Sequence, residues 1–231
     1  MKKLSAQINQ ISTTSNTINK IFQNLRNKIR INMHNEWKEK LLGLEPSDNG
    51  VARVEIDESK IIGNYEKTIW MFGMIDRADK NARIYCVLDD RSQENLMSYV
   101  RNNVYTVNDG LDRELSLNTR IYSDCFASYQ LSVFEEEGYK LHRVNHSIWF
   151  GSGLFNTKSI EGLWSQIKRL TKDFSGLTVN MLSKLENKGI NIKDYFDSWI
   201  CYGLYLRNIE KLKLSSLNTK KYLSSLLKII D

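Results

Sequence analysis

Three acidic residues, Asp57, Asp124 and Glu161, have the types and the spacing to do chemistry together. Asp57 ends the alternating stretch "VEID" and Asp124 ends "IYSD", so each aspartate lies where a strand is expected to end. If the two strands are parallel neighbours in one sheet, both aspartates lie at the same edge of it. Glu161 is expected at the rim of the buried face of a helix. That face is expected to contain Ile160, Leu163, Trp164 and Ile167.

Three carboxylates at one edge repel one another unless cations lie between them. Hard oxygen ligands of this kind bind Mg²⁺ or Mn²⁺. Two such ions can activate a nucleophile and neutralise a leaving oxygen in phosphoryl transfer. Lys168 follows Glu161 by two helical turns on the same face, where its ammonium group can hold a phosphate oxygen.

Each acidic position also has an ordinary structural interpretation. Asp57 and Glu58 fit a solvated strand end, and Asp124 fits the N-cap of a following helix. Glu161 and Lys168 fit a solvated helix face. Residue types and spacing alone leave both interpretations open.

The elements that must position these residues follow from the hydrophobic pattern. Strands are expected at about 51–57, 68–77, 82–88, 119–124 and 140–146, and helices at 92–104, 125–138 and 157–174, with helical sequence from 177 onwards. This order predicts an α/β fold, a mixed sheet flanked by helices. The stretch "EPSDNG" at 45–50 marks a boundary, which divides the chain into a helical segment 1–45, a catalytic domain 51–200 and a basic helical tail 201–231.

The segment 4–30 reads as a short helix, a polar turn "STTS" and a second helix. This is the outline of a helix-turn-helix, but a plain helical hairpin fits equally well. In the first case the recognition helix would open with Ser15, Asn16, Thr17, Asn19 and Lys20.

Charge and cysteine usage narrow the classes of protein. Residues 1–45 carry eight Lys/Arg against three Glu, and residues 200–231 carry six Lys/Arg against two acids. Basic ends suit a polyanion and a slightly acidic centre suits a metal ion, although a chance distribution of surface lysines gives the same count. Three widely spaced cysteines argue against a disulfide framework. The chain has neither an apolar run that could cross a membrane nor a signal peptide, so an intracellular protein is expected, nuclear in a eukaryotic host and cytoplasmic or nucleoid-associated in a bacterial one.

Six stretches between about residues 51 and 175 resemble one family. They are "VEIDES", "WMFGMIDR", "LDDRSQENL", "IYSDCFASY", "GYKLHRVNHS" and "NTKSIEGLWSQIKR". Their order and spacing are similar to those of DDE transposases of the bacterial insertion-sequence group with the ISXO-type domain and of the related Merlin elements. The resemblance implies a ribonuclease-H-like fold, two Mg²⁺ or Mn²⁺ ions and DNA as the substrate. It also implies cleavage at terminal inverted repeats, followed by attack of the freed 3′-OH on target DNA.

Carried over by motif, the resemblance makes Asp57, Asp124 and Glu161 the metal-binding triad. It makes Lys168 the following lysine and brings His146 close to the scissile phosphate, although a histidine satisfied by the backbone fits as well. Lys158, Lys168 and Arg169 are further candidates for DNA contacts. Tyr129 and Trp164 are expected to be packing residues. A homo-oligomer is expected by analogy with transposases that bring two DNA ends together.

The sequence departs from the family at two points. Lys158 replaces an asparagine found in many members, and no C-x-x-C pair exists to form the zinc ribbon of many bacterial members. Two other functions therefore stay open. One is a catalytically silent or domesticated transposase that only binds DNA, and the other is a nuclease of the same fold that carries out no strand transfer.

Overall fold

The computed structural model describes residues 15–44, 51–63, 68–106, 119–124, 129–144, 156–170 and 179–214. In chain order the elements are α2 (Ser15–Glu39), β1 (Arg53–Gly63), β2 (Thr68–Asp76), β3 (Ala82–Leu88), α3 (Gln93–Asn103), β4 (Arg120–Ser123), α4 (Leu131–Glu136), β5 (Lys140–Arg143), α5 (Lys158–Leu170), α6 (Val179–Asn187) and α7 (Ile192–Leu214). From β1 onwards this is the order of strands and helices that the hydrophobic pattern predicts.

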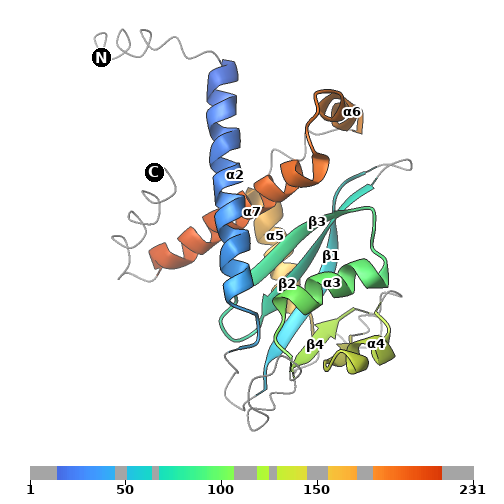
Figure 1. Cartoon of the computed structure of the whole chain (residues 1–231). Coiled ribbons are helices and arrows are strands. Elements are labelled where there is room, and N and C mark those ends of the chain that lie inside the picture. The colour runs from blue at the N-terminus through green and yellow to red at the C-terminus, as the bar shows by residue number, and fades with distance from the viewer. Residues whose placement is uncertain are drawn as a thin grey trace.

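The five strands form one mixed sheet in the order β3-β2-β1-β4-β5 (Figure 1). β1, β2 and β3 are antiparallel neighbours along the chain, and a short turn joins β2 to β3. β4 pairs parallel to β1, and β5 pairs parallel to β4. The condition stated for the two aspartates to lie at one edge, that their strands are parallel neighbours, is therefore met.

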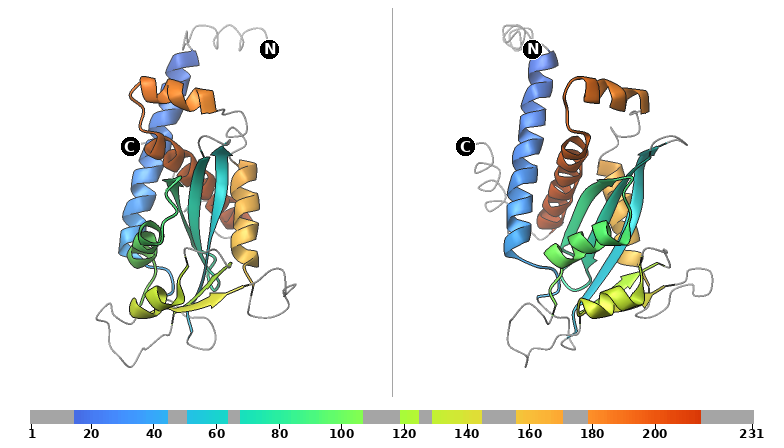
Figure 2. Two further views of the ribbon diagram at one scale, coloured as in Figure 1. Left: turned by 90° about the vertical axis from the view of Figure 1, so that its right-hand side faces the viewer. Right: turned by 45° about the vertical axis from the view of Figure 1, so that its right-hand side comes forward.

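Helices cover both faces of the sheet, so α5 and α3 lie on opposite sides of it (Figure 2). On one face, β2 and β3 pack against α5, α7 and the C-terminal half of α2. On the other face, β1, β2 and β4 pack against α3 and the segment around α4. Because strand side chains alternate, Val54 and Ile56 face the α3 side while Glu55 and Asp57 face α5.

α5 forms because its apolar residues recur at helical spacing. Ile160, Leu163, Trp164 and Ile167 are all buried, as predicted. α7 begins after Asn191, whose side-chain oxygen accepts the backbone N–H of Asp194 at 3.0 Å. α7 then continues through residue 200, where the sequence pattern suggested a domain boundary.

α2 belongs to the same packed body as α5 and α7. Ile29, Met33 and Trp37 are buried in the core cluster that contains them, and Arg30 pairs with Asp194 of α7 at 2.8 Å. α2 begins at Ser15, where the second helix of the predicted helix-turn-helix was expected. The first helix of that motif falls outside the described residues. No helix within the described ranges is both long and apolar enough to span a bilayer.

Two expected boundaries are wrong. β1 does not end at Asp57 but continues to Gly63, paired with β2 over this whole length. The helix expected over 125–138 is shorter, because α4 contains only Leu131–Glu136. Tyr129 therefore precedes this helix and is not part of it.

Candidate active site

The pairing of β1 with β4 brings Asp57 and Asp124 together. Glu55 is the partner of Tyr122 in the parallel register. Continued by two residues, this register places Asp57 beside Asp124, and the negative charge of Asp124 acts on Asp57. β4 ends at Ser123, so Asp124 is the first residue beyond it, whereas Asp57 is held inside β1.

The electrostatics of Asp57 reflect these neighbours. The pKa of the Asp57 carboxyl is raised from 3.8 to about 6, mainly by burial and also by the negative charges of Asp124 and Glu161. A hydrogen bond from Trp164 acts in the opposite direction but does not cancel these effects. Asp57 has no ion-pair partner among the described residues. Within the part of the chain that the structure describes, no cation therefore balances its charge.

Glu161 lies in the first turn of α5 with its side chain exposed. Thr157 donates its hydroxyl to Oε1 of Glu161 at 3.0 Å, and its carbonyl accepts the Glu161 backbone N–H at 3.1 Å. The charge of Glu161 reaches Asp57, but the three carboxylates do not converge closely. Across the described ranges, no three His, Cys, Asp or Glu side chains are grouped tightly enough to hold a metal ion.

Glu55 is a residue of this site that sequence reasoning missed. It is fully buried and faces α5, two residues before Asp57 on the same side of β1. Its Oε1 accepts Nε of Arg77 at 2.6 Å, and its Oε2 accepts the backbone N–H of Ile160 at 2.9 Å. The carboxylate therefore anchors the N-terminus of α5, where a negative charge is favourable. The signal in the sequence was an acid at the inward position of "VEID".

Arg77 completes this anchor from the end of β2. Its guanidinium lies 3.8 Å from the ring centroid of Tyr122 on β4 and also donates to the carbonyl of Asn156, just before α5. Arg77 thus joins β1, β4 and the segment that leads into the helix of Glu161. These contacts fix the start of α5 against the strands that hold the two aspartates.

Trp164 has a polar role that the packing prediction did not include. It is buried in the core, as predicted, but its indole Nε1 also donates to Oδ2 of Asp57 at 2.8 Å. Gly73 on β2 is the antiparallel partner of Asp57 and leaves room for this ring. A Cβ at position 73 would lie 2.8 Å from Cζ2 of Trp164, which is closer than real Cβ atoms approach. The glycine in "WMFGMID" therefore allows Trp164 to reach Asp57.

Glu58 lies on the opposite face of β1 from Asp57. Burial raises the pKa of its carboxyl to about 7, and the charges of Asp57 and Asp124 add to this effect. The fully buried Tyr129 donates its hydroxyl to Oε1 of Glu58. Tyr129 is thus a packing residue, as predicted, that also stabilises an acidic side chain beside the candidate site.

The basic residues of α5 are exposed. Lys168 lies two turns after Glu161, and Lys158 is the first residue of the helix. Arg169 pairs with Glu210 of α7 at 3.2 Å in an exposed ion pair. Their proposed contacts with DNA stay predictions. His146 lies outside the described residues.

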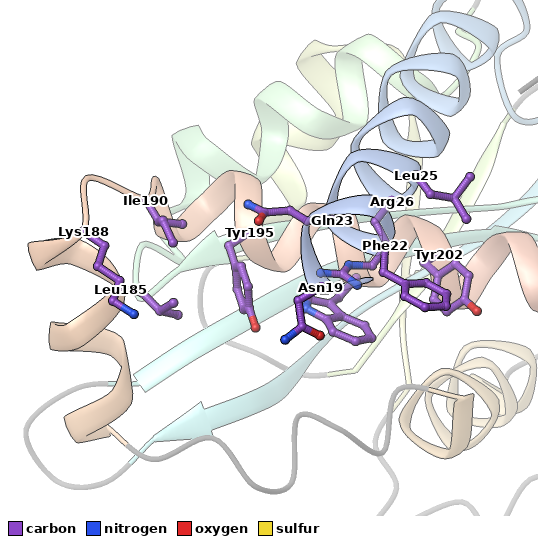
Figure 3. Close-up of a pocket in the computed structure, with 11 residues that line it drawn as sticks. Asn19, Phe22, Gln23, Leu25, Arg26, Leu185, Lys188, Ile190, Tyr195 and Tyr202 are labelled. Atoms are coloured by element: carbon purple, nitrogen blue, oxygen red, sulfur yellow. The ribbon is translucent and has the colours of Figure 1, made fainter. Parts of the chain in front are cut away.

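The residues predicted to open a recognition helix lie in the first two turns of α2. Ser15, Asn16, Thr17, Asn19 and Lys20 are all helical, and the side chains of the last three are exposed. Asn19 lines a pocket of about 620 Å³ between α2 and the α6–α7 region (Figure 3). Arg26 lies 3.8 Å from the ring centroid of Trp199 there. Asp57, Asp124, Glu161 and Lys168 do not line this pocket.

Comparison with known proteins finds no matching family model and no matching curated protein. The description of the protein therefore rests on its fold, which is a mixed sheet flanked by helices on both faces. A pair of aspartates lies on adjacent parallel strands, and a glutamate lies on the helix that follows the last strand.

Proposed function

We propose that this chain is a DDE-type DNA transposase with a ribonuclease-H-like catalytic fold. The observation that carries the proposal is the β1–β4 register, which brings Asp57 beside Asp124. The strand order β3-β2-β1-β4-β5, with three antiparallel strands followed by two parallel ones, supports the same fold. Glu161 follows on α5, as the family resemblance implies.

The donor chemistry of the site fits a hard divalent cation. Asp57, Asp124 and Glu161 offer only carboxylate oxygens, which are the ligands that Mg²⁺ and Mn²⁺ prefer. Burial and the negative charges of Asp124 and Glu161 raise the pKa of Asp57, and a bound cation would favour its charged form. Two Mg²⁺ or Mn²⁺ ions held by these three residues would supply a nucleophile and neutralise a leaving oxygen. Their binding would require the exposed Glu161 side chain to turn toward the two aspartates.

The protein residues around the triad have distinct positioning roles in this proposal. Trp164 holds one oxygen of Asp57 and leaves the other directed away from the indole. Glu55 holds the start of α5 in place, so Glu161, in the first turn of this helix, has a fixed position along β1. Lys168 is available to hold a phosphate oxygen, and His146 stays a predicted contact of the scissile phosphate.

The substrate in this proposal is DNA, namely transposon terminal inverted repeats and target DNA, bound by a homo-oligomer that pairs two ends. The test is a cleavage assay with purified protein and a labelled duplex carrying the sequence that flanks the gene. Mg²⁺ or Mn²⁺ is compared with EDTA. We expect metal-dependent nicking at the end sequence, and its loss in Asp57→Asn, Asp124→Asn and Glu161→Gln. Asp89→Asn, an exposed position after β3, serves as the matched control. Cleavage retained by any triad variant removes that residue from the triad.

A catalytically silent DNA-binding derivative is the second candidate. The observation that favours it is the spacing of the acids, since no group of three in the described part of the chain is tight enough to hold a metal. Such a protein would bind DNA equally in EDTA and in Mg²⁺, and its affinity would fall steeply with salt. Equal binding by wild type and Asp124→Asn, with cleavage by neither, would support this candidate.

A further inference from the structure

Three cationic residues lie close together beside α5, on the side of that helix that faces α7. Arg207 Nη2 and Lys211 Nζ, both from α7, donate to the backbone carbonyl of Lys80 at 3.2 and 2.9 Å. Lys80 lies in the β2–β3 turn with a left-handed backbone, φ 59°. Its own Nζ donates to Ser159 Oγ at 3.0 Å, two residues before Glu161. We call Lys80, Arg207 and Lys211 the α7 cation cluster.

The buried member of the cluster is Arg207, which is 5% exposed. Its Nε donates to Gln166 Oε1 at 2.9 Å, while its Nη1 is buried with no hydrogen-bond partner among the described residues. Burial lowers the pKa of this guanidinium, as expected for a desolvated charge. No carboxylate of the described chain forms an ion pair with it. Within the described part of the chain, the positive charge of Arg207 therefore lies just below the surface without an ion-pair partner.

The charge of Arg207 affects the pKa of the exposed member Lys211. Burial lowers the pKa of Lys211 to about 8, and the nearby charges of Arg207 and Lys80 lower it as well. Asp79 acts in the opposite direction, but its two oxygens accept the backbone and side-chain N–H groups of Asn81. Lys80 and Lys211 each have ammonium donors left over, because one Nζ hydrogen bond is recorded for each. An anion bound between them would relieve the repulsion.

We propose that the α7 cation cluster binds a backbone phosphate of the DNA substrate, next to the candidate active site. This inference rests on the proposed function, because the ligand it names is the substrate of that function. The surface around the cluster suits a long polyanion, since Lys80 and Lys211 are exposed and α5 presents an open face. A Cβ at Gly162 in that face would meet no atom of the described protein within 4 Å. The DNA backbone can then run over α5 from Lys80 and Lys211 to Glu161 and Lys168.

The first test measures binding of a random-sequence 30-base-pair duplex in EDTA, by fluorescence anisotropy, over a range of KCl concentrations. Each lost phosphate contact lowers the slope of log K against log [salt] by about 0.9. We expect this change in Lys211→Gln and in Lys80→Gln. Lys184→Gln, at an exposed position of α6, is the matched control and should keep the wild-type slope. Unchanged slopes in both cluster variants would overturn the proposal.

The second test keeps the protein unaltered. Lysines are acetylated at pH 8 with an N-hydroxysuccinimide ester and quantified by mass spectrometry. Lys211 should react faster than Lys184, and the duplex should protect Lys211 alone of the two. Equal protection by inorganic phosphate at the same phosphate concentration would overturn the assignment to DNA and indicate a small-anion site.

The two tests separate this inference from the transposase proposal. A smaller salt slope together with no metal-dependent nicking would support the cluster and refute the enzyme. Nicking that persists in Lys211→Gln and Lys80→Gln with wild-type salt slopes would support the enzyme and refute the cluster.

Discussion

Replacement of Asp57 by asparagine should stabilise the fold while it abolishes the proposed cleavage. The pKa of this carboxyl is raised from 3.8 to about 6, mainly by burial. At 1.36 kcal/mol per pKa unit, ionised Asp57 costs up to ~3 kcal/mol of folding free energy at neutral pH. The amide oxygen of asparagine can still accept the Trp164 N–H, but its NH₂ group needs a new partner. We therefore expect a net gain of ~2 kcal/mol, or about 4–8 °C in Tm.

The size of the stability difference between Asp57→Asn and wild type depends on pH. Because the folded-state pKa lies above the unfolded-state value, the destabilisation by Asp57 is fully present above about pH 6 and disappears toward pH 3.8. The advantage of Asp57→Asn over wild type should therefore be largest at pH 7–8. It should shrink as the pH falls through 6 and be nearly absent at pH 4.

Urea unfolding of wild type, Asp57→Asn and the control Asp89→Asn at pH 4, 6 and 8 measures this dependence. Added Mg²⁺ or Mn²⁺ should then stabilise the wild type and leave Asp57→Asn unchanged, because only the wild type retains the charged ligand. A variant that is less stable than wild type at pH 8, or equally displaced at all three pH values, would refute the reasoning.

Three further substitutions address the residues around Asp57. Gly73→Ala should destabilise the protein by about 1–3 kcal/mol and reduce cleavage, because the added Cβ displaces the Trp164 ring. Urea unfolding measures this loss at an unchanged m-value, and a variant as stable as wild type would contradict the prediction. Trp164→Phe keeps an aromatic ring but removes the N–H donor to Asp57, which raises the pKa of this carboxyl. The pH–cleavage profile should therefore move to higher pH, and an unmoved profile would exclude a role for the indole N–H. Glu55→Gln breaks a buried ion pair with Arg77 and should cost about 3 kcal/mol; a loss below 1 kcal/mol in thermal unfolding would show that Glu55 does not anchor α5.

The order of elements was predictable because each element carries its own local pattern. The strand of Val54 and Ile56 alternates, and α5 repeats its apolar residues every three or four positions. The parallel pairing of β1 with β4 was only a condition of the sequence argument, and the structure meets it. These inferences needed only residues that are close in sequence.

The parts that were missed depend on contacts between distant residues. β1 continues past Asp57 although Glu58 and Lys60 are polar, because it stays paired with β2. Tyr129, 71 residues away from Glu58, donates to its carboxylate. The role of Glu55 depends on Ile160, which is 105 residues away. A buried acid two residues before a candidate ligand gave the only local sign of this anchor.

The two contacts between β1 and α5 have matched spacings. Glu55 and Asp57 are two strand residues apart, about 6.6 Å. Their partners Ile160 and Trp164 are four helix residues apart, about 6 Å. The spacing of the two strand residues therefore matches the spacing of the two helix residues. A shift of register by one residue would break both contacts.

Because these two contacts fix the position of Glu161 along β1, the connection between β5 and α5 is not needed to fix that position. Insertions and deletions between Val144 and Asn156 can then accumulate without moving the glutamate relative to the two aspartates. The geometry of the candidate site is in this way separated from the length of the neighbouring connection.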